Sequence, residues 1–407
     1  MYAASETPST PASARSTASL SAALERARAH TDELFALVRP DSLYERPIPE
    51  RHRIIFYVGH LEAFDWNLLA RRTLDMPGFN PALDQLFAFG IDPPLGKLPE
   101  DAASDWPHLD EARAYVRRVR AVLDNAPGPL PEQLLHVAIE HRLMHAETFA
   151  YMLHNLPFDR KDGPRERPAP LGPAPQPSMV DIPAGEVRLS CRPEDGFGWD
   201  NEFPEHTEKV DGFSLGKYKV TNGEYLRFVA EGAAAPHFWN YRSGKWFYRA
   251  MFREIPLAPD WPVYVTQREA AAYAAWAGKR LPSEAEFHRA AYGAVGGEHF
   301  APDPARDNFD FRRWDPIPVH CSGENPAGLV GMIGNGWEWT ATLFAPFPGF
   351  EPFPFYPGYS ANFFDGGHYV LKGASPRTAA PLARPSFRNW FRPEYPYVYA
   401  GFRVAES

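Results

Sequence analysis

The chain has 407 residues, of which 44% are hydrophobic and 14% aromatic, and its formal net charge is −9. This length allows two or three domains, and the hydrophobic content excludes wholesale disorder. The negative charge gives no footprint for nucleic acid, and no run reaches the roughly 18 apolar residues of a membrane span, so we expect neither partner. Two cysteines, Cys191 and Cys321, suit a reducing compartment, which predicts a cytoplasmic protein.

The hydrophobic pattern changes once along the chain. Residues 1–20 have no apolar stretch and are expected to form a disordered tail. Residues 21–157 show helical spacing and predict a four-helix bundle, with helices near 19–38, 51–74, 109–126 and 131–156. Residues 158–178 are rich in proline and charge and predict a semi-rigid linker. Residues 179–407 predict an irregular α+β domain of short strands and turns, with one clear helix at 266–278.

Three histidines carry the strongest chemical signal. His141 and His145 lie four residues apart on the fourth expected helix, so both imidazoles project from one face and can bind one metal ion. His60, on the second helix, would complete a set of three neutral nitrogens. Such a set leaves about half of an octahedral shell free, which suits ferrous iron that must take up substrate and dioxygen. On spacing alone a surface or capping pair is the commoner explanation, and His136 is at the wrong spacing to join the set.

Five ordered motifs in the C-terminal part resemble the formylglycine-generating-enzyme (sulfatase-modifying factor) fold: MVDIPAGEVRLS, EFPEHTEKVDGFSLGKYKVTNGEYLRFV, WPVYVTQREAAAYAAWAGKRLPSEAEFHRAA, GNGWEWT and AGFRVA. The resemblance implies a variant of the C-type lectin architecture with a ligand surface on loops. It does not name a reaction, because this fold also serves non-catalytic binding modules. The copper-binding cysteine pair of the formylglycine-generating enzymes is not expected here, since no cysteine follows Cys321. In GNGWEWT, Trp337 and Trp339 are expected to support the fold.

The N-terminal bundle resembles the DinB-like domain, whose H-x-x-x-H-x-E signature appears as His141, His145 and Glu147. A DinB-like bundle followed by this C-terminal domain resembles the ergothioneine-type sulfoxide synthases. These are non-haem iron enzymes that join a chalcogen to the imidazole of hercynine with dioxygen. The resemblance covers residues 21–407. It implies Fe²⁺ as cofactor, O₂ as co-substrate, and His60, His141 and His145 as the iron ligands.

The same resemblance implies roles for aromatic residues near the C-terminus. Asn389 and Trp390, in FRNWF, would hold hercynine, the amide by hydrogen bonding and the indole by packing near the trimethylammonium group. Tyr356, in FYPGYS, matches the tyrosine that supplies a proton or an electron during dioxygen reduction. Tyr359 matches a neighbour at the hercynine site. For any one of these aromatics, ordinary core packing is the alternative.

Three departures from the family pattern concern the chalcogen donor. Phe391 and Tyr395 stand where an aspartate and an arginine hold γ-glutamylcysteine in the actinobacterial-type enzymes, so this dipeptide is expected to be a poor substrate. Met144 replaces a glutamine just before His145. FYVGHLEAFDW, around His60, replaces a WHLAHTTWFFE-like segment. Within the family, these departures are most similar to the selenoneine synthases, which couple hercynine to a selenosugar.

The sequence therefore predicts an iron(II)- and O₂-dependent enzyme that joins a selenosugar to hercynine with a new C–Se bond. An ergothioneine-pathway sulfoxide synthase that joins hercynine to cysteine or another thiol is the alternative of the same class. Two alternatives come from other classes: a non-catalytic lectin-like binding module, and a DinB-like hydrolase or transferase with zinc in the three-histidine site.

Overall fold

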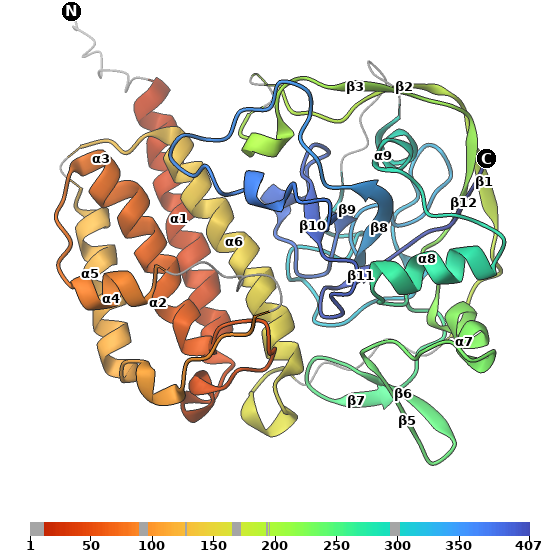
Figure 1. The fold of residues 1–407 in the computed structure, drawn as a ribbon, viewed down its shortest axis with the longest axis horizontal. Coiled ribbons are helices and arrows are strands. Elements are labelled where there is room, and N and C mark those ends of the chain that lie inside the picture. The colour runs from red at the N-terminus through yellow and green to blue at the C-terminus, as the bar shows by residue number, and fades with distance from the viewer. Residues whose placement is uncertain are drawn as a thin grey trace, which may run out of the picture. The chain divides into compact units, whose positions relative to one another are not determined.

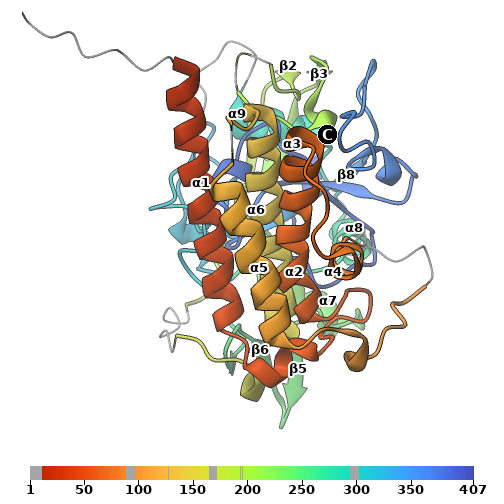
Figure 2. The ribbon, with the colours of Figure 1, turned by 90° about the vertical axis from the view of Figure 1, so that its left-hand side faces the viewer.

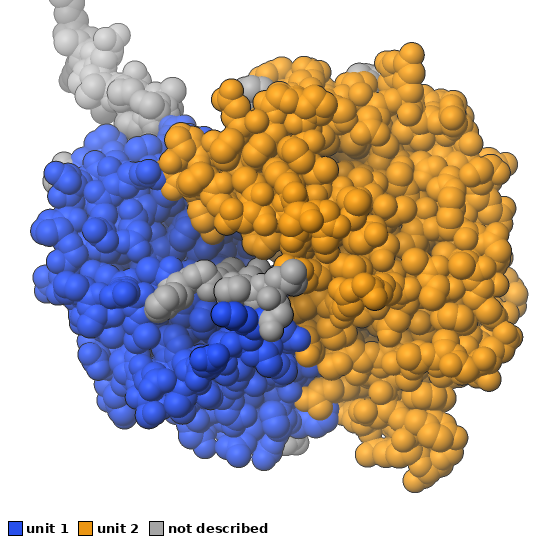
Figure 3. Space-filling view, in the orientation of Figure 1, with its two compact units in different colours: residues 1–162 blue, residues 163–407 orange. Residues whose placement is uncertain are grey.

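The computed structural model describes residues 12–88, 97–126, 128–164, 172–192, 194, 196–293 and 302–407. The chain divides into two compact units, residues 1–162 and 163–407 (Figure 3). The part of the expected tail before Ala12, and residues 165–171 of the expected linker, lie outside the described residues. Within the described ranges, no helix is long and apolar enough to cross a membrane.

Unit 1 is a helical bundle in which α1 packs on α6, and α2 packs on both α5 and α6 (Figures 1 and 2). Its helices are α1 (Ala12–Ala36), α2 (Ile54–Asp65), α3 (Arg72–Leu74), α4 (Pro81–Leu86), α5 (Leu109–Asp124) and α6 (Glu132–Asn155). A π-helical stretch, η2 (Trp66–Arg71), joins α2 to α3. The short 3-10 turns are η1 (Pro40–Tyr44), η3 (Ala103–Asp105) and η4 (Phe158–Arg160).

The helices of unit 1 differ in how much of their surface is buried. α5 buries one stripe, formed at helical spacing by Ala112, Tyr115, Val119 and Leu123, and exposes a charged face. α2 and α6 are buried on nearly all sides, including most of their polar residues. A helix that is buried all round belongs to the interior of its domain, so α2 and α6 form the centre of the bundle. Any ionisable side chain on them is shielded from solvent.

Two boundaries of unit 1 differ from those expected. α1 begins at Ala12, before the expected start near Ser19, because the segment after Pro11 contains no proline or glycine to interrupt a helix. Residues 158–162, at the start of the expected linker, pack on unit 1. Val38 forms a β-bridge with Lys161, and the Lys161 ammonium donates to two carbonyls near the end of α6. The lysine thus binds carbonyls in the last turn of the helix, where the regular helical hydrogen bonding ends.

Unit 2 combines short strands with three helices, α7 (Asn222–Ala230), α8 (Gln267–Trp276) and α9 (Glu284–Tyr292). The strands are β1 (Met179–Ile182), β2 (Gly185–Arg188), β3 (Thr207–Val210), β4 (Phe213–Gly216), β5 (Trp239–Arg242), β6 (Lys245–Arg249), β7 (Glu254–Pro256), β8 (Gly336–Leu343), β9 (Tyr369–Ala374), β10 (Asn389–Phe391), β11 (Ala400–Gly401) and β12 (Ala405–Glu406). The 3-10 turns are η6 (Asp200–Glu202), η7 (Val319–Cys321), η8 (Ala361–Phe363) and η9 (Ala380–Leu382).

Four small sheets are formed by these strands. The four-stranded sheet has the order β10-β9-β8-β11 and lies near the middle of the unit (Figure 1). Its pairs are antiparallel except β8 with β11, which is parallel. The other sheets are β1-β4-β12, β2-β3 and β5-β6-β7. β10 is an edge strand, in register with β9 from Asn389 opposite Leu371 to Phe391 opposite Tyr369.

All three helices of unit 2 begin with a capping box. In each, a Thr or Ser side chain accepts from the backbone N–H three residues later, and the Glu at that position accepts in return: Thr221 with Glu224, Thr266 with Glu269 and Ser283 with Glu286. α8 corresponds to the helix expected at 266–278. α7 and α9 were not expected, although the T-x-x-E and S-x-x-E patterns that start them are visible in the sequence.

Trp337 and Trp339 on β8 are almost fully buried, as expected for residues that support the fold. The Trp339 indole N–H donates to the backbone carbonyl of Val265 at 2.8 Å, so its polar atom is satisfied inside the core. Cys191 and Cys321 are not joined by a disulfide.

Candidate metal centre

The structure brings the three predicted histidines together inside unit 1. His60 lies on α2, and His141 and His145 lie one turn apart on α6. One ring nitrogen from each lies within 4.8 Å of the other two, and the Nε2 atoms of His141 and His145 are 3.1 Å apart. All three side chains are buried, with exposed fractions of 6%, 4% and 3%. The spacing of four residues on a helix thus produces the predicted pair, and α2 supplies the third ring.

The orientation of His60 is fixed by a backbone carbonyl that sequence reasoning did not identify. His60 Nδ1 lies 2.7 Å from the Phe87 carbonyl oxygen. A carbonyl can only accept, so Nδ1 carries the proton and the lone pair is on Nε2. A Cβ on Gly59 would lie 2.4 Å from the Phe87 ring, so only glycine allows Phe87 to pack this closely beside His60. Metal-binding histidines are commonly held by such a hydrogen bond on the second ring nitrogen.

Aromatic rings hold the imidazoles from the sides. Phe56 stacks on His60 at 4.6 Å between ring centroids, and Phe64 stacks on His141 at 3.5 Å. Burial lowers the pKa of His60 to about 4, against the opposing effect of the Phe87 hydrogen bond, and lowers the pKa values of His141 and His145 well below 6.5. The three rings are therefore neutral at pH 7, which is the form that binds metals.

The donor set fits a divalent transition metal. His60 Nε2 is buried and has no hydrogen-bond partner within the described part of the chain. The Nε2 atoms of His141 and His145, 3.1 Å apart, lie close enough together to bind one ion jointly. Three imidazoles suit iron, zinc, copper or nickel, so these ligands alone do not choose between them. Neutral ligands also leave the full charge of the ion available to anionic co-ligands.

Other candidate residues on α6 lie outside this set. His136 is half-buried and does not belong to the metal-binding cluster, in agreement with its spacing. Met144, which was expected near the substrate, is half-buried, and Glu147 is buried.

In unit 2, three of the predicted aromatic residues belong to one cluster. The Trp390 ring stacks on Phe344 at 4.2 Å and meets the edge of Tyr359 at 5.4 Å. Tyr359 is buried and stacks on Trp199 at 3.9 Å. Tyr356 is half-buried, with its ring 5.6 Å from that of Tyr359. Trp390, Tyr359 and Tyr356 therefore form one continuous aromatic group, assembled from segments distant in sequence.

Phe391 and Tyr395 belong to a different cluster. Their rings stack at 5.1 Å with an interplanar angle of 14°, and Tyr395 continues to Tyr397 and then His237. Successive residues of a strand point to opposite faces, which places Trp390 on one side of β10 and Phe391 on the other. Asn389 shares the face of Phe391, and its side-chain oxygen accepts from the Trp390 backbone N–H at 2.9 Å. The strand thus separates Trp390 from Phe391, whereas Asn389, which was also expected at hercynine, lies on the face of Phe391.

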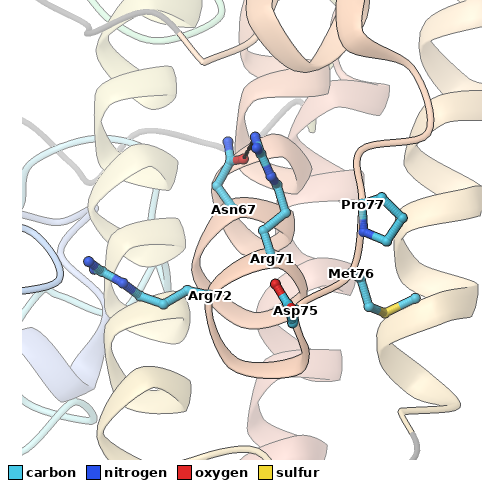
Figure 4. A pocket seen from close by; sticks show the side chains of 6 residues that line it. All are labelled: Asn67, Arg71, Arg72, Asp75, Met76 and Pro77. Atoms are coloured by element: carbon cyan, nitrogen blue, oxygen red, sulfur yellow. Dashed lines mark hydrogen bonds between the residues drawn. The ribbon is translucent and has the colours of Figure 1, made fainter.

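A surface pocket of about 530 Å³ in unit 1 contains none of the predicted site residues (Figure 4). Its lining residues are Asn67, Arg71, Arg72, Asp75, Met76 and Pro77. Arg71 folds back and donates to the Asn67 side chain at 3.3 Å, whereas Arg72 points away from it (Figure 4). Because its polar groups do not converge on one point, this pocket lacks the character of a ligand site.

Comparison with known proteins agrees with both units. Residues 166–407 match the sulfatase-modifying factor enzyme 1-like domain. The hercynine oxygenase of Mycolicibacterium smegmatis is 35% identical, over 72% of this chain and 77% of that protein. The chain belongs to the hercynine oxygenase family. Ergothioneine biosynthesis protein 1 of Neurospora crassa is 28% identical over 90% of this chain, which spans 55% of the length of that protein. Among solved structures, PvdO from Pseudomonas aeruginosa aligns with 60% of this chain and 99% of its own, at 23% identity and a TM-score of 0.43.

Membership of this family confirms the predicted fold class, an α+β protein with an N-terminal helical bundle and a C-terminal formylglycine-generating-enzyme-like domain. It also confirms the family inferred from the motifs. The selenoneine branch within the family is not distinguished by these matches.

Proposed function

We propose that the protein is an iron(II)- and O₂-dependent enzyme that forms a carbon–chalcogen bond at the imidazole of hercynine, with a thiol as the donor that its relatives favour. One observation carries the proposal: three buried, neutral imidazoles converge in a chain of the hercynine oxygenase family. The named relatives act in hercynine oxygenation and ergothioneine biosynthesis, which supports sulfur chemistry as the first reading.

His60, His141 and His145 would hold the iron, which would provide the redox-active centre through which electrons pass from the two substrates to dioxygen. Phe87 keeps the proton of His60 on Nδ1 and so leaves Nε2 free for the metal. The phenol oxygen of Tyr356 would hold the proton, or supply the electron, that decides the fate of the reduced oxygen. A positioned donor of this kind acts as a general acid.

The aromatic group around Trp390 suits the trimethylammonium group of hercynine. A quaternary ammonium cannot donate a hydrogen bond, so aromatic faces are its usual partners in proteins. Trp390 and Tyr356 are half-buried and therefore accessible to a ligand, whereas Tyr359 is buried beneath them. Asn389 would bind hercynine through its amide, as the family resemblance implies.

A selenosugar is the second candidate donor, and the pair Phe391 and Tyr395 favours it. The two stacked rings offer neither a carboxylate nor a guanidinium to a charged donor. The charged residues on either side are engaged elsewhere, Arg392 with Asp365 at 3.8 Å and Glu394 with Arg268. A neutral sugar bearing selenium pays a smaller desolvation free energy on entering such a site than a dipeptide with two charged ends.

The test is anaerobic reconstitution with Fe²⁺, followed by addition of O₂ and hercynine with cysteine, γ-glutamylcysteine or a selenosugar. Oxygen uptake and the mass of the product are measured together. We expect one donor to give O₂-dependent coupling to hercynine. Coupling with none of the donors, while the protein binds iron, would overturn the proposal. Activity with Zn²⁺ and no O₂ would favour a hydrolase or transferase, and absence of any bound metal would favour a binding module.

A further inference from the structure

A buried cluster of charges lies at the centre of the bundle, next to the histidines in sequence. Arg142, which follows His141 on α6, donates from Nη2 to Glu62 Oε2 and to Asp65 Oδ2, both at 2.8 Å. Glu62 and Asp65 lie on α2, two and five residues after His60. The three charged side chains are each about 1% exposed. One guanidinium therefore joins the two helices that carry the metal ligands.

The other long helices of unit 1 complete this charge cluster. Arg142 Nη1 donates to the Thr31 hydroxyl on α1 at 3.3 Å. Arg120 on α5 binds Glu62 Oε1 at 2.7 and 2.9 Å, and Arg28 on α1 lies 3.9 Å from Asp65. At the outer edge, Arg120 also binds Asp32 at 2.6 and 2.8 Å, where the Asp32 side chain is half exposed. Arg142 is thus the inner member of a chain of contacts that reaches solvent at Asp32.

The hydrogen bond from His60 to Phe87 orients that ring, but the described contacts of the histidines between α2 and α6 are ring contacts. Phe64 on α2 stacks on His141, and His60 lies beside the rings of His141 and His145; packing of this kind is non-directional. A helix can therefore shift or rotate slightly against such a surface at small cost. A metal site requires its ligand distances to hold within about 0.2 Å. Charge-assisted hydrogen bonds of 2.8 Å are directional and resist such shifts.

We propose that Arg142 is a positioning residue for the metal centre. By holding Glu62 and Asp65, it fixes the axial position and the rotation of α2 relative to α6. This sets the distance of His60 from His141 and His145. The inference rests on the proposed function only in taking these three histidines as the metal ligands. Stability alone is a weak reason for the cluster, because buried ion pairs often contribute no more than apolar residues of similar volume.

The test separates positioning from folding by replacing the whole inner cluster with apolar residues. The triple variant Arg142→Met, Glu62→Leu and Asp65→Leu leaves Arg120 with Asp32, and Arg28 with Asp124 at 2.6 Å. We expect its melting temperature in the absence of metal to stay near that of the wild type. We expect its affinity for Co²⁺, measured by chelator competition with the visible spectrum of the bound ion, to fall about 10-fold to 100-fold with a changed spectrum.

Arg142→Lys is the second variant, because it keeps the charge and removes the planar fork. We expect its Co²⁺ affinity to lie between those of the wild type and the triple variant. Asp32→Asn is the matched control. It breaks the outer ion pair while leaving Arg142 intact, and its Co²⁺ affinity and spectrum should be those of the wild type.

Wild-type affinity and spectrum in the triple variant would overturn the positioning role. Should the triple variant not fold, wild-type affinity and spectrum in Arg142→Lys would do the same. His141→Ala is measured in parallel: if it binds Co²⁺ as tightly as the wild type, the metal site itself is wrong and the proposed function falls first. Weaker binding in Asp32→Asn equal to that of the triple variant would also count against a specific role for Arg142.

Discussion

If the proposed discrimination against γ-glutamylcysteine is correct, we expect a charged pair introduced at Phe391 and Tyr395 to reverse it. Both rings are half-buried and stack on each other, and the flanking Arg392 is already paired with Asp365. A γ-glutamylcysteine molecule bound here would leave its ammonium and carboxylate groups without partners. The double variant Phe391→Asp with Tyr395→Arg supplies one partner for each.

The size of the handicap for γ-glutamylcysteine follows from how deeply the two rings are buried. An unpaired charged or polar group costs about 1–3 kcal/mol when buried, and half-buried positions belong at the lower end of this range. Two groups at about 1 kcal/mol each amount to about 2 kcal/mol, or a handicap of about 30-fold in kcat/KM. The double variant should recover most of this factor for γ-glutamylcysteine and lose turnover with a selenosugar. Loss of the stacked pair should lower the stability of unit 2 by about 0.5–1.5 kcal/mol.

The assay is a competition between γ-glutamylcysteine and a selenosugar in one vessel, with the product ratio read by mass spectrometry. Tyr395→Phe keeps the stacked ring and adds no charge, so its product ratio should equal that of the wild type. The reasoning is refuted if the unmodified protein uses γ-glutamylcysteine as well as or better than the sugar. It is equally refuted if the folded double variant leaves the ratio unchanged.

Three further predictions concern the metal, the tyrosine and acid stability. His141→Ala should abolish the stabilisation that Fe²⁺ gives in an anaerobic thermal melt, about 2.7 kcal/mol at a hundredfold excess over Kd, whereas His136→Ala should keep it; the opposite result would misplace the site. Tyr356→Phe should fold normally and form the product about 10²-fold to 10⁴-fold more slowly or with a changed product ratio, and an unchanged rate and ratio would remove its role. Burial raises the pKa of Glu202, but Arg384 and its hydrogen bonds outweigh burial and lower that pKa below 4.5. The carboxylate therefore stabilises the fold above pH 4.5, and this contribution is lost as the pH falls through the folded pKa. Glu202→Gln should lower the melting temperature at pH 7, and a deficit that persists unchanged at pH 3 would contradict this.

The parts of the site that depend on helical periodicity could be predicted from sequence. His141 and His145 share a face because they are four residues apart, and the apolar pattern around His60 placed it on a buried helix. The tautomer of His60 could not be predicted, because it depends on the carbonyl of Phe87, which is held 27 residues away by a close approach to Gly59. A backbone carbonyl leaves no signature in a sequence.

The buried charges and the aromatic clusters show a second limit of prediction from the sequence. Arg142 and Glu62 appear in the sequence as ordinary helix charges, and only the packing of four helices shows that they are buried together. The separation of Trp390 from Phe391 follows from strand alternation once β10 is known, but a three-residue strand is too short to predict from periodicity. α7 and α9 were not predicted: each has nine residues, too few for a helical pattern to stand out, and their capping boxes are the one clear signal.

The way unit 2 closes its sheets sets an order for its folding. β4 receives its second neighbour from β12, where Ala405 pairs with Leu215, and β8 receives β11 from Ala400 and Gly401. During synthesis, β4 therefore waits for β12 until 189 further residues have been added (from 216 to 405), whereas β8 waits for β11 for 57 residues (from 343 to 400). Unpaired strand edges invite association with other chains, and such long-range pairings form slowly. The late pairing of β12 therefore leaves one edge of β4 exposed for most of the synthesis of unit 2.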